Sequence, residues 1–127
     1  MADAVLDASA VLAYLNNEAG AERVAAYVGK ARISAVNVAE VETQLLLHGA
    51  SLDVVRTVLD LVGLEIVDFD RELADLTASF AAPSRHLGLS LGDRACLALA
   101  FRDGKPAVTA DRAWQQAKLG VQIQLIR

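Results

Sequence analysis

Short apolar runs alternate with longer helical patterns along this chain, and that alternation restricts its fold more than any other feature. The apolar runs predict five strands, at residues 4–6, 32–34, 64–67, 107–109 and 121–126. Apolar residues spaced three and four apart predict helices between them, at residues 9–15, 21–28, 38–47, 52–62, 71–81 and 90–102. Because strands that alternate with helices form βαβ units, we expect an α/β fold with a parallel sheet and helices on both of its faces.

Length and composition narrow the class of protein. The 127 residues correspond to one domain, which we place at residues 1–127. The single cysteine, Cys96, excludes a disulfide framework, and its apolar neighbours favour a buried side chain over a nucleophile. No signal peptide or membrane-spanning run is recognisable, so we expect a cytoplasmic protein. The hydrophobic share of 54% favours a surface buried against another chain, although alanine-rich helices also raise that share.

Charge is unevenly distributed along the chain. The net charge of −4 argues against a nonspecific polyanion binder. Residues 1–64 carry four basic and eight acidic residues, whereas residues 84–127 carry seven basic and three acidic ones. The C-terminal third therefore offers the positive charge that a phosphate backbone needs.

Four acidic residues stand at corresponding places in the predicted fold. Asp7 directly follows the first strand and Asp111 follows the fourth, while Glu40 and Asp93 are expected in the first turns of their helices. The carboxyl ends of the strands and the N-termini of the helices meet along one edge of an open α/β sheet, which is where ligands bind. We therefore expect these four carboxylates to converge on one site.

Helix capping is the alternative explanation for each of these acids taken singly. Two pairs have the spacing of a capping box: Asn37 with Glu40, and Ser90 with Asp93. Capping does not explain why two strand ends mirror each other, since Asp7-Ala8-Ser9 and Thr109-Ala110-Asp111 each set a hydroxyl two residues from a carboxylate.

Clustered carboxylates repel one another unless cations lie between them. Hard divalent cations prefer oxygen ligands, and no Cys/His pattern indicates zinc, so we expect Mg²⁺, with Mn²⁺ as a substitute. The predicted metal ligands are Asp7, Glu40, Asp93 and Asp111, and the predicted hydrogen-bond donors to the site are Ser9 and Thr109. Such a site is typical of phosphodiester hydrolysis, because the metal activates water and neutralises charge on the phosphate. This chemistry does not by itself choose RNA over DNA.

Two other classes share parts of the pattern. A phosphatase or dehalogenase of the Asp-x-Asp type needs an acid two residues after Asp7, and that position is Ser9. A non-enzymatic phospho-receiver module has a Lys-Pro pair after its hydroxyl-bearing strand, whereas Lys105-Pro106 precedes Thr109 here. The pattern therefore favours a metal-dependent nuclease over both of these classes.

Four segments of the sequence resemble the PIN-domain ribonucleases, and within them the VapC-like toxins of toxin–antitoxin pairs. They are VLDASA at residues 5–10, ISAVNVAEV at 33–41, GLSLGDRA at 88–95 and VTADRAW at 108–114. The resemblance covers essentially the whole chain, and the last two segments together carry it most specifically. The family's acidic residues fall on Asp7, Glu40, Asp93 and Asp111, and its polar position beside the last acid falls on Thr109.

The resemblance implies a three-layer α/β/α sandwich with a central, mostly parallel five-stranded sheet. It also implies a Mg²⁺- or Mn²⁺-dependent endoribonuclease that forms homodimers and binds a cognate, VapB-like antitoxin. A PIN nuclease of RNA maturation or decay, without a toxin role, is the alternative within the family.

Overall fold

All five expected strands are present in the computed structural model, which describes residues 2–127. They are β1 (Ala4–Leu6), β2 (Ala31–Ser34), β3 (Glu65–Val67), β4 (Ala107–Thr109) and β5 (Ile123–Leu125). The α-helices are α1 (Ala8–Leu15), α2 (Ala21–Ala25), α3 (Ala35–Leu47), α4 (Leu52–Val62), α5 (Arg71–Ser79) and α6 (Leu91–Asp103). Two 3₁₀ helices complete the described chain, η1 (Arg85–Leu87) and η2 (Arg112–Gln116).

The strands form one sheet in the order β3-β2-β1-β4-β5, and every pairing in it is parallel. Val5 of β1 pairs with Arg32 on one side and with Ala107 on the other, so β1 lies at the centre. The chain builds the sheet outward to β3 and then returns to place β4 on the other side of β1. The strand order therefore reverses between β1 and β4, and open α/β sheets bind ligands at the carboxyl ends of such a pair.

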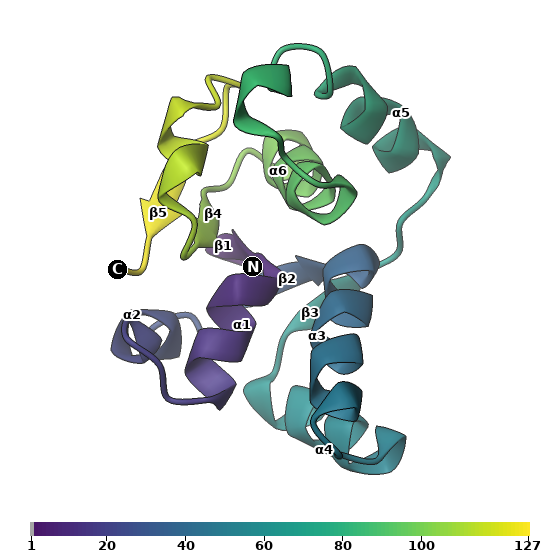
Figure 1. Ribbon diagram of the computed structural model, residues 1–127, viewed down its shortest axis with the longest axis vertical. Coiled ribbons are helices and arrows are strands. Elements are labelled where there is room, and N and C mark those ends of the chain that lie inside the picture. Colours follow the sequence, from purple (N-terminus) through teal and green to yellow (C-terminus); the bar gives the residue numbers. More distant parts are fainter. Residues whose placement is uncertain (1) are drawn as a thin grey trace.

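Helices cover both faces of the sheet, as Figure 1 shows: α1 to α4 lie on one face, and α5 and α6 on the other. Successive residues of a strand point to opposite faces. Ala4 and Leu6 of β1 accordingly join the core on the α1 side, while Val5 joins the core on the α6 side. The predicted three-layer α/β/α sandwich is confirmed.

Helix α6 is the most deeply buried helix of the fold. All residues from 95 to 100 are at most 1% exposed, and Cys96 among them is fully buried, as its apolar neighbours predict. A helix that is apolar on most sides has to be enclosed by other elements, and α6 packs against both the sheet and α5. Within residues 2–127, no helix combines the length and apolar character needed to cross a membrane.

Several helix ends differ from the predicted ones for local reasons. Helix α3 begins at Ala35 rather than Val38, because the Ser34 hydroxyl accepts a hydrogen bond from the Val36 backbone and caps the helix there. Helix α2 ends at Ala25 rather than at residue 28, since the backbone beyond it tightens into single turns ahead of Gly29, whose φ is +74°. Helix α5 ends at Ser79 in the same manner, before residue 81.

The apolar side chains of helix α4 are divided between the core and the surface. Ser51 caps it and Gly63, in the left-handed conformation, ends it, so its bounds agree with the predicted helix at residues 52–62. Val55, Leu59 and Val62 are buried in the domain's own core, whereas Val54 is 54% exposed. Some apolar side chains of α4 therefore pack in the protein's own core, and others face outward.

Candidate active site

The four predicted acids line one pocket of about 740 Å³ at the carboxyl end of the sheet. Asp7 follows β1 and Asp111 follows β4, so the two lie at the point where the strand order reverses. Asp93 stands in the first turn of α6, and Glu40 reaches the pocket from α3. The predicted hydroxyl residue Ser9 also lines this pocket.

Asp7 is the most enclosed of the four acids, with 5% of its surface exposed. Its carboxylate accepts hydrogen bonds from the Ala10 backbone at 2.8 Å, from the Ser9 hydroxyl at 2.7 and 2.9 Å, and from the Thr109 hydroxyl at 2.6 Å. Burial raises the pKa of Asp7 to about 6, and these donors offset part of that rise by stabilising the charged form. The negative charge of Asp93 adds a smaller upward contribution to the pKa.

Ser9 and Thr109 join the two strand ends through their hydroxyl groups. The Ala110 backbone N–H donates to the Ser9 Oγ at 3.0 Å, and the Asp111 N–H donates to the Thr109 Oγ1 at 3.0 Å. The two hydroxyl oxygens lie 3.4 Å apart. The mirrored Asp-Ala-Ser and Thr-Ala-Asp segments thus form one hydrogen-bonded unit that orients the Asp7 carboxylate.

Glu40 lies farther into its helix than the predicted first turn. Helix α3 starts at Ala35, so Glu40 belongs to the second turn, and Ser34 rather than Asn37 is the N-cap. The alternative explanation of Glu40, a capping box with Asn37, therefore does not hold. Instead, the Asn37 Nδ2 donates to the Glu40 Oε1 at 2.8 Å and to the Gly92 carbonyl at 3.0 Å.

Asp93 and Asp111 do cap their helices. Asp93 forms with Ser90 the capping box that was its alternative explanation, in which its Oδ2 accepts from the Ser90 backbone at 2.9 Å. The Asp111 Oδ1 accepts from the Ala113 backbone at 3.0 Å. Each capping bond engages a single carboxylate oxygen, and the second oxygen of both residues has no hydrogen-bond partner within residues 2–127. Capping therefore leaves both acids able to bind a ligand.

The charge of these acids is not balanced by the described protein. In the part of the chain that the structure describes, none of the four forms an ion pair with a lysine, arginine or histidine. Their partners are hydroxyls, backbone amides and the Asn37 side chain, all of them neutral. A pocket that gathers carboxylates around neutral donors has an excess of negative charge that favours a cation.

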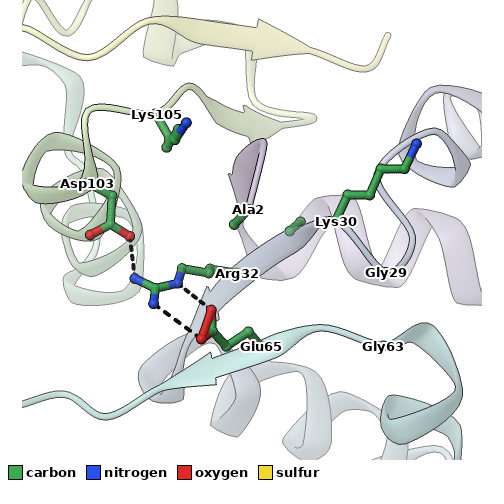
Figure 2. Close-up of a pocket in the computed structure, with 9 residues that line it drawn as sticks. Ala2, Gly29, Lys30, Arg32, Gly63, Glu65, Asp103 and Lys105 are labelled. Carbon is green, nitrogen blue, oxygen red and sulfur yellow. Dashed lines mark hydrogen bonds and ion pairs between the residues drawn. The ribbon is translucent and has the colours of Figure 1, made fainter.

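At the opposite end of the sheet the acidic residues are paired with an arginine, as Figure 2 shows. Arg32 on β2 donates through Nε and Nη2 to Glu65 on β3, and through Nη1 to Asp103 at the end of α6, at 2.9 Å. Arg102 also donates to Asp103, at 3.2 Å. Hydrogen bonding to Arg32 lowers the pKa of Glu65. The acids at this end are thus neutralised by the protein itself.

The residues of the acidic pocket fit a hard divalent cation in kind. All four ligand candidates offer carboxylate oxygens, which Mg²⁺ and Mn²⁺ prefer, and Gly92 leaves free the space that the Glu40 carboxylate occupies. Among residues 2–127, no three His, Cys, Asp or Glu side chains are already grouped closely enough to hold a metal ion. The four carboxylates share a pocket without being grouped that closely.

Asn37 and Gly92 also line this pocket, and neither was predicted to do so. The spacing of Asn37 suggests only a helix cap, and Gly92 is simply part of the GLSLGDRA segment. The i, i+3 spacing of Asn37 and Glu40 is the available signal, since residues so spaced are neighbours on a helix surface. Gly92 has no comparable local signal, because its role depends on the approach of α3 to α6.

Comparisons with known proteins agree with this fold. No match was found among curated proteins. A DNA-bound VapBC from Salmonella typhimurium has 20% sequence identity and a TM-score of 0.73, with 100% of each chain covered. A toxin–antitoxin complex from Klebsiella pneumoniae has 17% identity and a TM-score of 0.75, with 98% of each chain covered. FitAcB from Neisseria gonorrhoeae has 21% identity and a TM-score of 0.68, with 97% of each chain covered.

The sequence itself provides the family assignment. The family model described as PIN domain matches residues 4–119, a span that runs from the first residue of β1 to beyond η2 and includes all four acids of the pocket. The chain belongs to the PIN domain family.

Proposed function

We propose that this protein is a Mg²⁺- or Mn²⁺-dependent endoribonuclease that hydrolyses RNA phosphodiester bonds. The PIN domain family is a family of nucleases. The observation that carries the proposal is the pocket at the strand reversal, where four carboxylates gather without a basic partner in residues 2–127. A divalent cation supplies the missing positive charge.

Each acid has a distinct part in this proposal. Asp7, Glu40 and Asp93 would hold the main cation, and Asp111 would hold it as well or help to hold a second one. The chemistry supplied by such a cation is the activation of water and the neutralisation of charge on the phosphodiester. Ser9 and Thr109 orient the Asp7 carboxylate and favour its charged form, which is the form that binds metal.

The preference for RNA rests on the resemblance to the PIN-domain ribonucleases. Charge does not decide it: among the seven basic residues in 84–127, Arg102 and Lys105 lie with Asp103 at the opposite end of the sheet, and no lysine or arginine within residues 2–127 lines the acidic pocket. The family to which the ribonucleases belong matches this chain. We accordingly assign RNA as the substrate class.

A toxin role with an antitoxin partner is part of the same proposal. The similar structures from Salmonella typhimurium and Klebsiella pneumoniae are described as VapBC and as a toxin–antitoxin complex. Exposed apolar side chains on α3 and α4 support a binding partner, with Leu47 76% and Leu61 78% exposed. We expect a homodimer and a tighter complex with a VapB-like antitoxin, both measurable by light scattering; a monomer at high concentration would contradict the dimer.

The test of the proposed function is cleavage of RNA with and without metal. Purified protein should lose activity in EDTA and regain it with Mg²⁺ or Mn²⁺. The products should carry 5′-phosphate and 3′-hydroxyl ends, because water rather than the 2′-hydroxyl attacks the phosphorus. Activity that persists in EDTA, or products with cyclic 2′,3′-phosphates, would refute the metal mechanism. Growth arrest on expression, relieved by an antitoxin, separates a toxin from a nuclease of RNA maturation or decay.

A further inference from the structure

Glu40 differs from the other three acids in what holds it. Asp7, Asp93 and Asp111 each accept a backbone N–H at the start of a helix, which fixes their short side chains. Glu40 has a longer side chain and lies in the second turn of α3, where no free backbone N–H is within its reach. Something outside the backbone therefore has to place its carboxylate in the pocket.

Asn37 supplies that contact. Its Nδ2 donates to the Glu40 Oε1 at 2.8 Å and to the Gly92 carbonyl at 3.0 Å, so one amide group joins Glu40 to the first turn of α6. That turn also carries Asp93. The Asn37 side chain thus links Glu40 directly to the turn that carries Asp93.

Gly92 provides the space for this arrangement. A Cβ atom added at residue 92 would overlap both oxygens of the Glu40 carboxylate. The backbone at Gly92 is helical and does not require glycine, because its φ lies outside the left-handed region. Glycine is therefore needed for the room it leaves to Glu40, and a methyl group there would displace a flexible carboxylate rather than the backbone.

We propose that Asn37 is a positioning residue which, together with Gly92, holds the Glu40 carboxylate at the metal site. This inference rests on the proposed function, since it takes the acidic pocket to bind a divalent cation. Asn37 is 1% exposed, and its Oδ1 has no hydrogen-bond partner in the described chain. A residue that served only to pack α3 against α6 would not need to bury an unpaired oxygen, which is unfavourable. The two hydrogen bonds that Nδ2 donates give the amide a specific role at this position.

Mn²⁺ affinity, measured by electron paramagnetic resonance on the purified full chain, tests this proposal without relying on cleavage. Asn37→Ala removes the donor, and Gly92→Ala displaces the carboxylate while leaving the donor in place. Both should weaken Mn²⁺ binding by about 10- to 100-fold, as loss of outer-shell partners typically does. Gly92→Ala should melt at or above the wild-type temperature, because alanine is the better helix former. Gln122→Ala, which removes an exposed amide outside the pocket, is the control and should keep wild-type affinity.

A double-mutant cycle separates positioning from a general structural role. If Asn37 acts through Glu40, then Asn37→Ala should change Mn²⁺ affinity little once Glu40→Gln is present. Equal losses in both backgrounds would show that Asn37 supports the fold and would overturn the proposal. Wild-type affinity in both Asn37→Ala and Gly92→Ala, beside a loss in Glu40→Gln, would also overturn it while leaving the proposed function intact. A wild-type protein that binds no Mn²⁺ and cleaves RNA in EDTA would instead refute the proposed function itself.

Discussion

At the amino end of the sheet Arg32 lies between Glu65 and Asp103, whereas at the carboxyl end Asp7, Glu40, Asp93 and Asp111 share a pocket without any basic partner in residues 2–127. The two ends shift the pKa values of their carboxyl groups in opposite directions. Hydrogen bonding to Arg32 lowers the pKa of Glu65, while burial raises the pKa of Asp7 to about 6. At the amino end the charge of the acids is balanced by arginine, whereas at the carboxyl end no basic residue within residues 2–127 balances it.

This contrast indicates what each end is for. Ion pairs at the amino end join β2, β3 and α6, so they contribute to the fold. At the carboxyl end the same fold holds acids in place with neutral donors and leaves their charge unbalanced. Perturbed and uncompensated groups in a pocket are typical of functional sites. We infer that the missing positive charge comes from a ligand.

The largest difference between the two ends of the sheet should appear in the rate of RNA cleavage when one glutamate at each end is replaced by glutamine. Glu40→Gln removes a proposed ligand and should lower RNA cleavage by more than about 100-fold, since outer-shell changes alone cost 10- to 100-fold in such sites. Glu65→Gln removes a partner of Arg32 far from the pocket and should leave the cleavage rate unchanged. The measurement is the single-turnover rate in saturating Mg²⁺. Equal cleavage rates for the two variants would contradict the claim that only the carboxyl end of the sheet takes part in catalysis.

Stability as a function of pH should reveal the raised pKa of Asp7 in metal-free protein. Its pKa is about 6 in the folded state, against an ordinary value of 3.8 for an aspartate in the unfolded chain, so the native state binds the proton more tightly. The stability linked to this group is therefore fully present below pH 3.8 and lost as the pH rises through about 6. A shift of this size corresponds to about 3 kcal/mol.

Asp7→Asn abolishes that titration, and the comparison with wild type isolates it from the other acids. In EDTA, the free energy of unfolding of the variant relative to wild type should increase by about 2.4 kcal/mol between pH 4 and pH 7, because part of the effect already lies below pH 4. Urea unfolding at a series of pH values measures this difference. A difference that does not change with pH would show that Asp7 titrates normally.

A smaller effect is expected at the amino end, where the ion pairs stabilise the fold. Arg32→Met keeps the apolar stem and removes the charge, so Asp103 loses a partner at a largely buried position. The loss should be about 1 kcal/mol and should shrink at high salt. Arg71→Met, which breaks an ion pair between two highly exposed side chains, is the control and should cost less. Thermal melting measures both, and a salt-independent loss would point to packing instead of charge.

The sequence predicts the fold and the acidic pocket because both depend on local patterns. Apolar runs place the ends of β1 and β4, and these ends place Asp7 and Asp111. The same patterns place Glu40 one turn too early in α3, because Ser34 reads as the last residue of a strand and also serves as the helix cap.

Local sequence patterns do not predict contacts between segments that are far apart in the chain. Gly92 accepts a hydrogen bond from Asn37, 55 residues away, and Arg32 pairs with Asp103, 71 residues away. Both contacts depend on how α6 packs against the other elements, and no periodicity in the sequence encodes that distance. The positioning of Glu40 and the ion pairs at the amino end are therefore visible only in the folded chain.

Helix α6 offers the most direct test, because it carries an aspartate at each end of the sheet. Melting curves of wild type, Asp93→Asn and Asp103→Asn should be recorded in EDTA and in Mn²⁺. In EDTA, Asp93→Asn should melt above wild type, since it relieves repulsion with Asp7, whereas Asp103→Asn should melt below it, since Arg32 loses a partner. Added Mn²⁺ should raise the melting temperature of wild type and Asp103→Asn equally, and that of Asp93→Asn much less, because stabilisation follows affinity. An Asp93→Asn variant that melts below wild type in EDTA and gains as much from Mn²⁺ would show that Asp93 is only a helix cap, and would contradict the metal site.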